Sequence, residues 1–79
     1  PGPLQTVTSY GNRILVAKIR RGNYLFLTWK GDHSPRHVHV YKDRRLVVKW
    51  NLEGSEPMSG AASARLRRLI DAMVREGVL

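Results

Sequence analysis

Residues 24–51, YLFLTWKGDHSPRHVHVYKDRRLVVKWN, contain three β-strand patterns separated by a loop and a turn. The patterns are rich in β-branched, aromatic and alternating apolar residues, which is typical of strands. Gly31 and Pro35 break the first junction, and residues 43–45 form the turn at the second. The predicted strands cover residues 24–29, 37–42 and 46–51.

The sequence on either side of this stretch adds one more strand and a connector. Residues 13–19 are apolar and β-branched, and residues 20–23 form a turn before the next strand. Residues 53–59 are rich in Gly, Ser, Glu and Pro and are predicted as a connector. Four strands joined in chain order by short links are expected to form an antiparallel meander.

Residues 60–76 have the periodicity of an amphipathic helix, with Ser59 as the expected N-cap and Gly77 as the C-terminal stop. Its apolar stripe consists of Leu66, Leu69, Ile70, Met73 and Val74. A small sheet needs one face covered, and this helix is the candidate cover. The predicted fold class is α+β: a four-stranded antiparallel β-meander with one C-terminal helix packed on one face. Residues 13–79 form this single domain, and residues 1–12 form a tail that begins like a cloning remnant.

Alternation along the strands assigns side chains to two faces of the sheet. The face expected beneath the helix carries Leu25, Leu27, Trp29, Val38, Val40, Leu46, Val48 and Trp50. The open face is expected to carry Tyr24, Phe26, Thr28, His37, His39, Tyr41, Val47 and Lys49. In this register, Phe26 and Lys49 flank His39.

The charge balance favours an anionic partner. The chain has 14 Lys and Arg residues against 6 Asp and Glu residues, a net charge of +8, which suits nucleic acid or an acidic protein. A generically basic protein kept soluble by its charge is the alternative. There is no cysteine, so disulfides and cysteine-based zinc sites are excluded, and a reducing cytoplasm is the expected location. No apolar run approaches the length of a membrane span, so no membrane association is expected.

All three histidines lie within residues 32–40, DHSPRHVHV, at the start of one predicted strand. Histidine titrates near neutral pH and suits general acid–base catalysis. In a catalytic interpretation, His33, His37 and His39 cleave a phosphodiester without metal and Asp32 orients them. Arg36, Lys49 or Arg45 would stabilise the charge that develops on phosphate.

Three other interpretations of the same residues remain open. In a structural interpretation, Asp32 caps the loop by bonding the backbone two residues on, Pro35 fixes the entry to the strand, and the histidines are exposed polar positions. In a binding interpretation, aromatic and basic side chains of the open face hold unstacked nucleotides: Tyr24, Phe26, Tyr41, Arg36, Lys49, Arg44 and Arg45. The aromatic residues could equally be cross-strand pairs that only stabilise the sheet. In a metal interpretation, His37 and His39 bind zinc or iron with His33 or Asp32 as the third ligand.

The stretch from Leu25 to about Val74 resembles a small bacterial family of uncharacterised domains. The family signature is D-H-x-P-P-H-F-H-V between an aromatic strand and a further strand pair with a C-terminal helix. The matching positions here are Asp32, His33, Pro35, His37, His39 and Val40. Arg36 and Val38 stand where the signature has proline and phenylalanine.

The resemblance implies an α+β fold, a bacterial cytoplasmic setting and membership of a toxin–antitoxin-type gene pair. It brings no catalytic assignment. We therefore expect a basic, toxin-like protein that acts on RNA by binding or by metal-independent cleavage. We expect no cofactor, and we expect a small acidic antitoxin-like protein as its partner. A non-catalytic module that binds nucleic acid or an acidic protein through the same face is the alternative, and a small metal-binding protein is the second. A homodimer is also compatible with the sequence.

Overall fold

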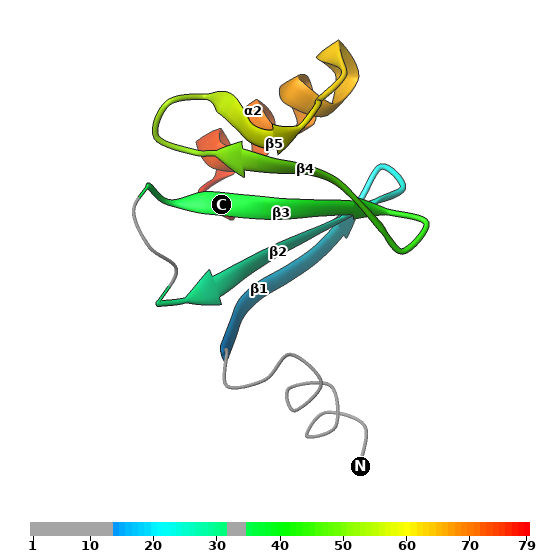
Figure 1. Ribbon diagram of the computed structural model, residues 1–79. Coiled ribbons are helices and arrows are strands. Elements are labelled where there is room, and N and C mark those ends of the chain that lie inside the picture. The colour runs from blue at the N-terminus through cyan, green and yellow to red at the C-terminus, as the bar shows by residue number, and fades with distance from the viewer. Residues whose placement is uncertain (1–13, 32–34) are drawn as a thin grey trace.

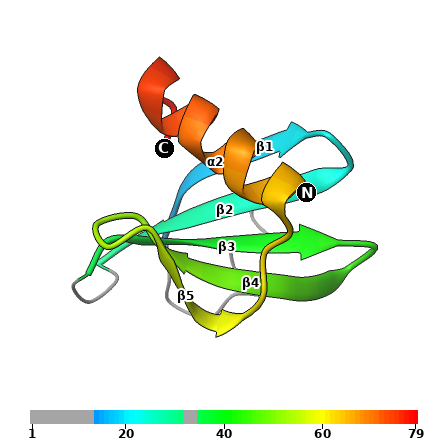
Figure 2. The same ribbon diagram turned by 90° about the horizontal axis from the view of Figure 1, so that it is seen from above.

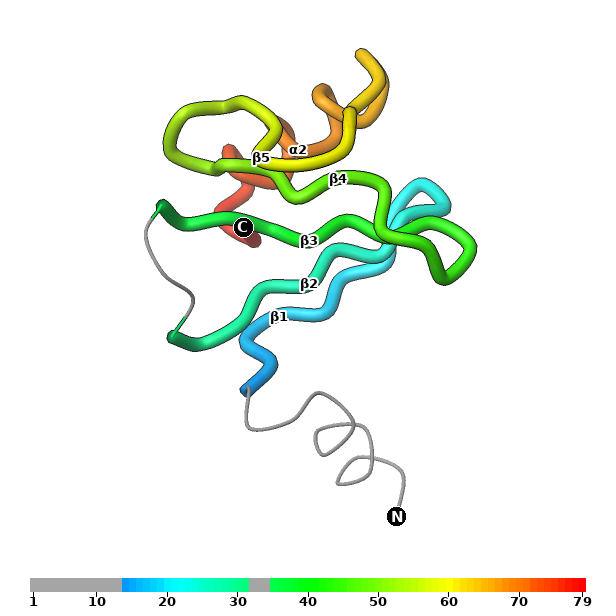
Figure 3. Tube along the Cα trace, viewed as in Figure 1, coloured from blue at the N-terminus to red at the C-terminus, as the bar shows by residue number. Residues whose placement is uncertain are grey.

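The computed structural model describes residues 14–31 and 35–79, which form one antiparallel sheet and one helix (Figure 1). The strand order β1-β2-β3-β4-β5 follows the chain, and Figure 3 traces the resulting meander. The elements are β1 (Ile14–Arg21), β2 (Tyr24–Lys30), β3 (His37–Lys42), β4 (Arg45–Asn51), β5 (Glu56–Gly60) and α2 (Ala64–Glu76). The expected α+β architecture is confirmed, with five strands where four were predicted.

The additional strand β5 covers most of the predicted connector and the first residue of the predicted helix, and it moves the start of the helix. It pairs with β4 through contacts such as Lys49 with Ser59, and its composition is tolerated because it is an edge strand. The helix therefore starts at Ala64 rather than near residue 60. Its N-cap is Ser63, whose hydroxyl accepts a hydrogen bond from the Leu66 N–H at 3.1 Å, and not Ser59. Gly77 ends the helix in the left-handed conformation, as expected.

Helix α2 lies over one face of the sheet and closes the hydrophobic core (Figure 2). The core consists of Phe26, Val38, Val40, Val48 and Trp50 from the sheet with Leu66, Ile70 and Met73 from the helix. The predicted apolar stripe is thus confirmed as core, except that Val74 at its end is 44% exposed. A guanidinium carbon of Arg67 lies 5.6 Å from the centre of the Trp50 ring and covers the edge of this core.

Strand β2 presents the opposite face to the one its sequence predicted. Phe26 pairs with Val40 and Leu27 pairs with His39, and residues directly opposite in a ladder share a face. Tyr24, Phe26 and Thr28 therefore lie on the helix side, and Leu25, Leu27 and Trp29 on the other. A shift of one residue exchanges the two faces of a strand, and β2 is apolar on both, so its pattern did not fix the choice.

A β-bulge in β4 explains a second difference. Val40 pairs with Val48, but the next residue, Tyr41, pairs with Leu46, which leaves Val47 as the extra residue. Val47 packs against the core, whereas Leu46 is 48% exposed on the other side of the sheet. The expected burial of Val48 and Trp50 beneath the helix is confirmed, and that of Leu46 is wrong.

One ion pair joins the end of β1 to the end of α2. The Arg21 guanidinium, at the end of β1, donates to both carboxylate oxygens of Glu76 at 2.9 and 3.0 Å. It is half exposed, so it contributes at most about 1 kcal/mol to stability.

Within residues 14–31 and 35–79, no helix has both the length and the apolar character needed to cross a bilayer.

Candidate functional site

The sheet face opposite the helix carries the two described histidines, and we call it the histidine face. The register assigns to it Lys18, Arg20, Leu25, Leu27, Trp29, His37, His39, Tyr41, Leu46 and Lys49. One row crosses four strands, because Lys18 pairs with Leu27, Leu27 with His39, and His39 with Lys49. The predicted grouping of His37, His39, Tyr41 and Lys49 on one face is therefore confirmed, but the face is not open along its whole length, because His37 is buried.

His37 and His39 are neighbours on β3, with ring centres 5.2 Å apart in an edge-to-face arrangement. His37 is only 8% exposed, whereas His39 is half-buried. The Pro35 carbonyl lies 2.8 Å from Nδ1 of His37. Because a carbonyl can only accept, Nδ1 of His37 is the donor in this contact. Of the two rings, His39 is the more accessible to a ligand.

Contacts with the β4–β5 turn hold the start of β3 in place. The Arg36 N–H donates to Oε2 of Glu53 at 2.6 Å, and the Arg36 carbonyl accepts from the Leu52 N–H at 2.8 Å. Asn51 shapes this turn, since its Oδ1 accepts from the N–H groups of Glu53 and Gly54 at 2.8 Å. The Arg36 side chain is left exposed beside the histidine face.

The aromatic part of the predicted site is not assembled as expected. Phe26 is fully buried in the core, and Tyr24 lies beside it with ring centres 6.2 Å apart. The Lys42 ammonium sits 5.7 Å from the Tyr24 ring centre on that same side. Of the three predicted aromatics, only Tyr41 lies on the histidine face. Leu27 takes the place beside His39 that was predicted for Phe26, whereas Lys49 does flank His39 as expected.

The two turn arginines of the prediction separate. Arg45 pairs with Lys42 on the helix side of the sheet, whereas Arg44 lines a cavity on the histidine face. Asp32 and His33 lie outside the described residues, so their predicted roles receive no structural description.

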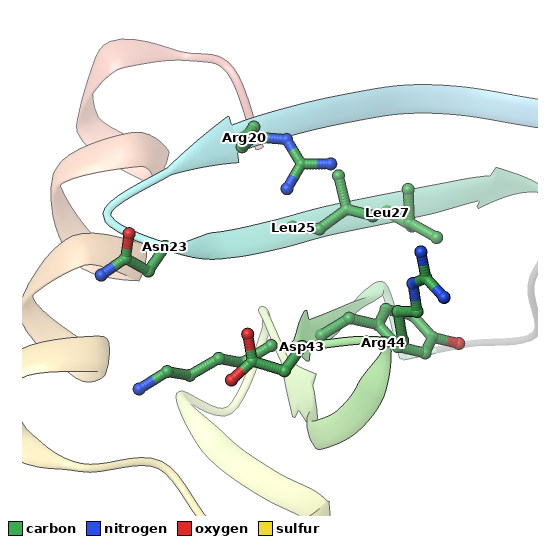
Figure 4. A pocket seen from close by; sticks show the side chains of 8 residues that line it. Arg20, Asn23, Leu25, Leu27, Asp43 and Arg44 are labelled. Carbon is green, nitrogen blue, oxygen red and sulfur yellow. The ribbon is translucent and has the colours of Figure 1, made fainter.

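The sequence did not reveal the cavity that Arg44 lines, which has a volume of about 820 Å³. It lies between the β1–β2 and β3–β4 turns and is drawn in Figure 4. Its lining residues are Arg20, Asn23, Leu25, Leu27, Tyr41, Lys42, Asp43 and Arg44. Leu25 and Leu27 line it only because β2 has the register described above. A second hollow of about 440 Å³ includes Trp29, Arg36 and His37 in its lining.

The described residues do not by themselves form a metal centre. Among residues 14–31 and 35–79, no three His, Asp or Glu side chains converge to hold an ion. The third ligand predicted for such a site, His33 or Asp32, belongs to the segment that is not described.

Comparisons with protein-family models, with curated proteins and with solved structures found no significant match to this chain. The resemblance of the D-H-x-P-x-H-x-H-V stretch to a bacterial family therefore stays a prediction. The residues of the histidine face are therefore the basis for the function proposed below.

Proposed function

We propose that the protein binds single-stranded RNA through the histidine face. The observation that carries this proposal is the gathering of cations on that face. Lys18 and Lys49 lie in the same cross-strand row as His39, and Arg20 and Arg44 lie at the neighbouring cavity. Four cations along one small face can follow a phosphate backbone, and the net charge of +8 adds a long-range attraction.

The contacts on this face favour phosphate over base recognition. Tyr41 is the one predicted stacking residue on the face, and it is half-buried. Phe26 and Tyr24 are on the opposite side, and Trp29, the β2 aromatic on the histidine face, is only 7% exposed, so β2 gives little support to an extended platform of stacked bases. RNA binding should therefore depend mainly on the release of counterions and fall steeply as salt rises.

The test is fluorescence anisotropy with a labelled 12-nucleotide uridine RNA. Four phosphate contacts predict a slope of about −3 for the logarithm of the binding constant against the logarithm of salt concentration. Between 50 and 200 mM salt, the affinity then falls about 50-fold. Removing two contacts with Lys18→Gln/Lys49→Gln should reduce the slope by about 1.4.

The matched control is Arg65→Gln/Arg68→Gln, which removes the same charge from exposed positions of α2. We expect this control to leave the slope within about 0.3 of the wild type, because those positions face away from the histidine face. Equal losses from both pairs would mean that the protein attracts RNA only through its net charge, and would reject the histidine face as the binding surface.

Cleavage of the bound RNA is the second candidate function. The specific observation in its favour is the 5.2 Å contact between the His37 and His39 rings next to Lys49. His39 would take the proton of the attacking ribose 2′-hydroxyl and return it to the leaving 5′-oxygen as the P–O5′ bond breaks, His37 would position it, and Lys49 would meet the phosphate. This activity is one of the two ways, binding and cleavage, in which a toxin-like protein with an acidic partner would act on RNA.

The cleavage assay uses the same RNA with a mixed-sequence extension, incubated without divalent metal and resolved on a gel. Catalysis predicts fragments with the wild type and none with His39→Ala, while the two proteins bind with similar affinity at 100 mM salt. Intact RNA at all times, with binding retained, would leave the protein as a binding module and remove the enzyme from consideration.

A further inference from the structure

Two tight turns lie at the same end of the meander and form the walls of the 820 Å³ cavity. The β1–β2 turn consists of Gly22 and Asn23, with φ of 59° and 71°, and the β3–β4 turn consists of Asp43 and Arg44, with φ of 54° and 68°. Two successive residues with positive φ are the pattern of a type I′ hairpin turn. Both hairpins therefore close with two residues, and Asn23, Asp43 and Arg44 of these turns line the cavity.

Arg44 is an unusual residue for its position. Gly, Asn and Asp are the residues that take the left-handed conformation at low cost, and arginine is not among them. The turn would be at least as stable with asparagine there. Backbone strain of this kind concentrates at functional positions. The positive φ of Arg44 therefore suggests a role for its side chain.

The Arg44 and Arg20 guanidinium groups enter the same space from opposite sides, in front of Leu25 and Leu27 (Figure 4). In the part of the chain that the structure describes, neither side chain makes an ion pair or a hydrogen bond. Lys42 also lines the cavity, but its ammonium is directed to the Tyr24 ring on the other side of the sheet. The cavity thus has two arginines available for an anion.

The remaining walls define the body of the ligand. Leu25 and Leu27 provide an apolar floor, and Tyr41 adds an aromatic side chain. Asp43 adds one carboxylate to the lining, so the negative charge of a ligand is best held on the arginine side. The volume lies within the range of about 300–1,000 Å³ that is usual for small-molecule sites.

We propose that this cavity binds one nucleotide, with its phosphate between Arg20 and Arg44 and its base against Tyr41 and the leucine floor. Guanidinium groups match phosphate oxygens in pairs, and a flat base covers aromatic and aliphatic surface. The inference rests on the proposed RNA binding and deepens it: the cavity is the place where the histidine face holds a single nucleotide unit of the strand.

The first experiment is an NMR titration of ¹⁵N-labelled protein with adenosine 5′-monophosphate and, separately, with adenosine. We expect the monophosphate to shift the backbone amides of Arg20, Asn23, Leu25 and Arg44, and adenosine to bind at least about tenfold more weakly. Shifts confined to other surfaces, or equal affinity for the two compounds, would overturn the nucleotide site.

The second experiment compares Arg44→Asn with Arg45→Asn, which removes the same charge one residue away and outside the cavity. Arg44→Asn should weaken the monophosphate and the 12-nucleotide RNA about tenfold each. Its melting temperature should stay the same or rise, because asparagine accepts the left-handed conformation. Arg45→Asn should weaken RNA binding less than about threefold, and equal effects of the two variants would overturn the proposal.

The outcomes separate this inference from the proposed function. RNA binding that depends on Lys18 and Lys49 but not on Arg44 supports the histidine face and rejects the cavity as a nucleotide site. Binding of the monophosphate without any binding of RNA rejects the RNA function and supports a mononucleotide site. If the protein binds neither RNA nor the monophosphate, both the proposed function and the nucleotide site are rejected.

Discussion

Gly60 offers the sharpest test of the packing that positions β5 against β4. Its φ is 77°, and a Cβ added there would overlap the carbonyl oxygen of Val47, the bulge residue, and lie 3.0 Å from the Val48 Cα. Both neighbours are backbone atoms, so no side-chain rotation relieves the overlap. Gly60→Ala therefore adds a steric cost to the conformational cost of a left-handed alanine.

Gly77 provides the matched control because its φ is 81° and a Cβ there would meet nothing within 4 Å. The conformational cost alone is about 1 kcal/mol, and overpacking against a rigid neighbour adds about 1–3 kcal/mol. We expect Gly77→Ala to lower the free energy of unfolding by about 1 kcal/mol, and Gly60→Ala by about 2–4 kcal/mol. For a domain of this size the melting temperature then falls by about 4–8 °C and about 10–30 °C, respectively.

The assay is thermal unfolding followed by circular dichroism, with amide hydrogen exchange of β5 as a second readout. Gly60→Ala should accelerate exchange in β5, and Gly77→Ala should not. Equal destabilisation by the two variants would show that Gly60 serves only its φ angle. The close approach of β5 to the Val47 bulge would then not be a feature of the folded protein.

Two further pairs of variants test the corrected helix start and the strand register. Ser63→Ala should lower the free energy of unfolding in urea by about 1 kcal/mol because it removes the N-cap. Ser59→Ala should change that free energy by less than about 0.5 kcal/mol. The reverse ranking would favour a helix that starts near residue 60 with Ser59 as its N-cap. Phe26→Ala should cost about 3–5 kcal/mol because Phe26 is fully buried, and Leu46→Ala less than about 1 kcal/mol because Leu46 is 48% exposed. A small effect at Phe26 together with a large one at Leu46 would reverse the assigned faces.

The sequence predicted those parts of the fold in which local pattern and tertiary packing agree. Strand β3 has histidines on one side and valines on the other, so its limits and its faces followed from alternation alone. Helix α2 ends at Gly77 as expected, because glycine takes the left-handed conformation without a steric cost. The shared face of His37, His39 and Lys49 followed from the same alternation.

Other parts depend on contacts that no local pattern encodes. Strand β2 is apolar on both faces, so only its pairing of Phe26 with Val40 decides which face meets the helix. Strand β5 contains Pro57 and Gly60, which are disfavoured in strands and permitted here by its edge position. The cavity needed the β2 register together with the positive φ of Arg44, and neither is visible in the sequence.

The meander order also determines how the chain can reach this structure. Every strand pairs with its neighbour in sequence, so each hairpin closes a short loop at low entropic cost. The helix meets the sheet through contacts that are distant in the sequence: its Glu76 pairs with Arg21 across 55 residues. Topologies dominated by such local pairing fold fast. We therefore expect the pairing of the strands, which builds the cavity and the histidine face, to contribute little to the entropic cost of loop closure, and the docking of the helix to contribute most of it.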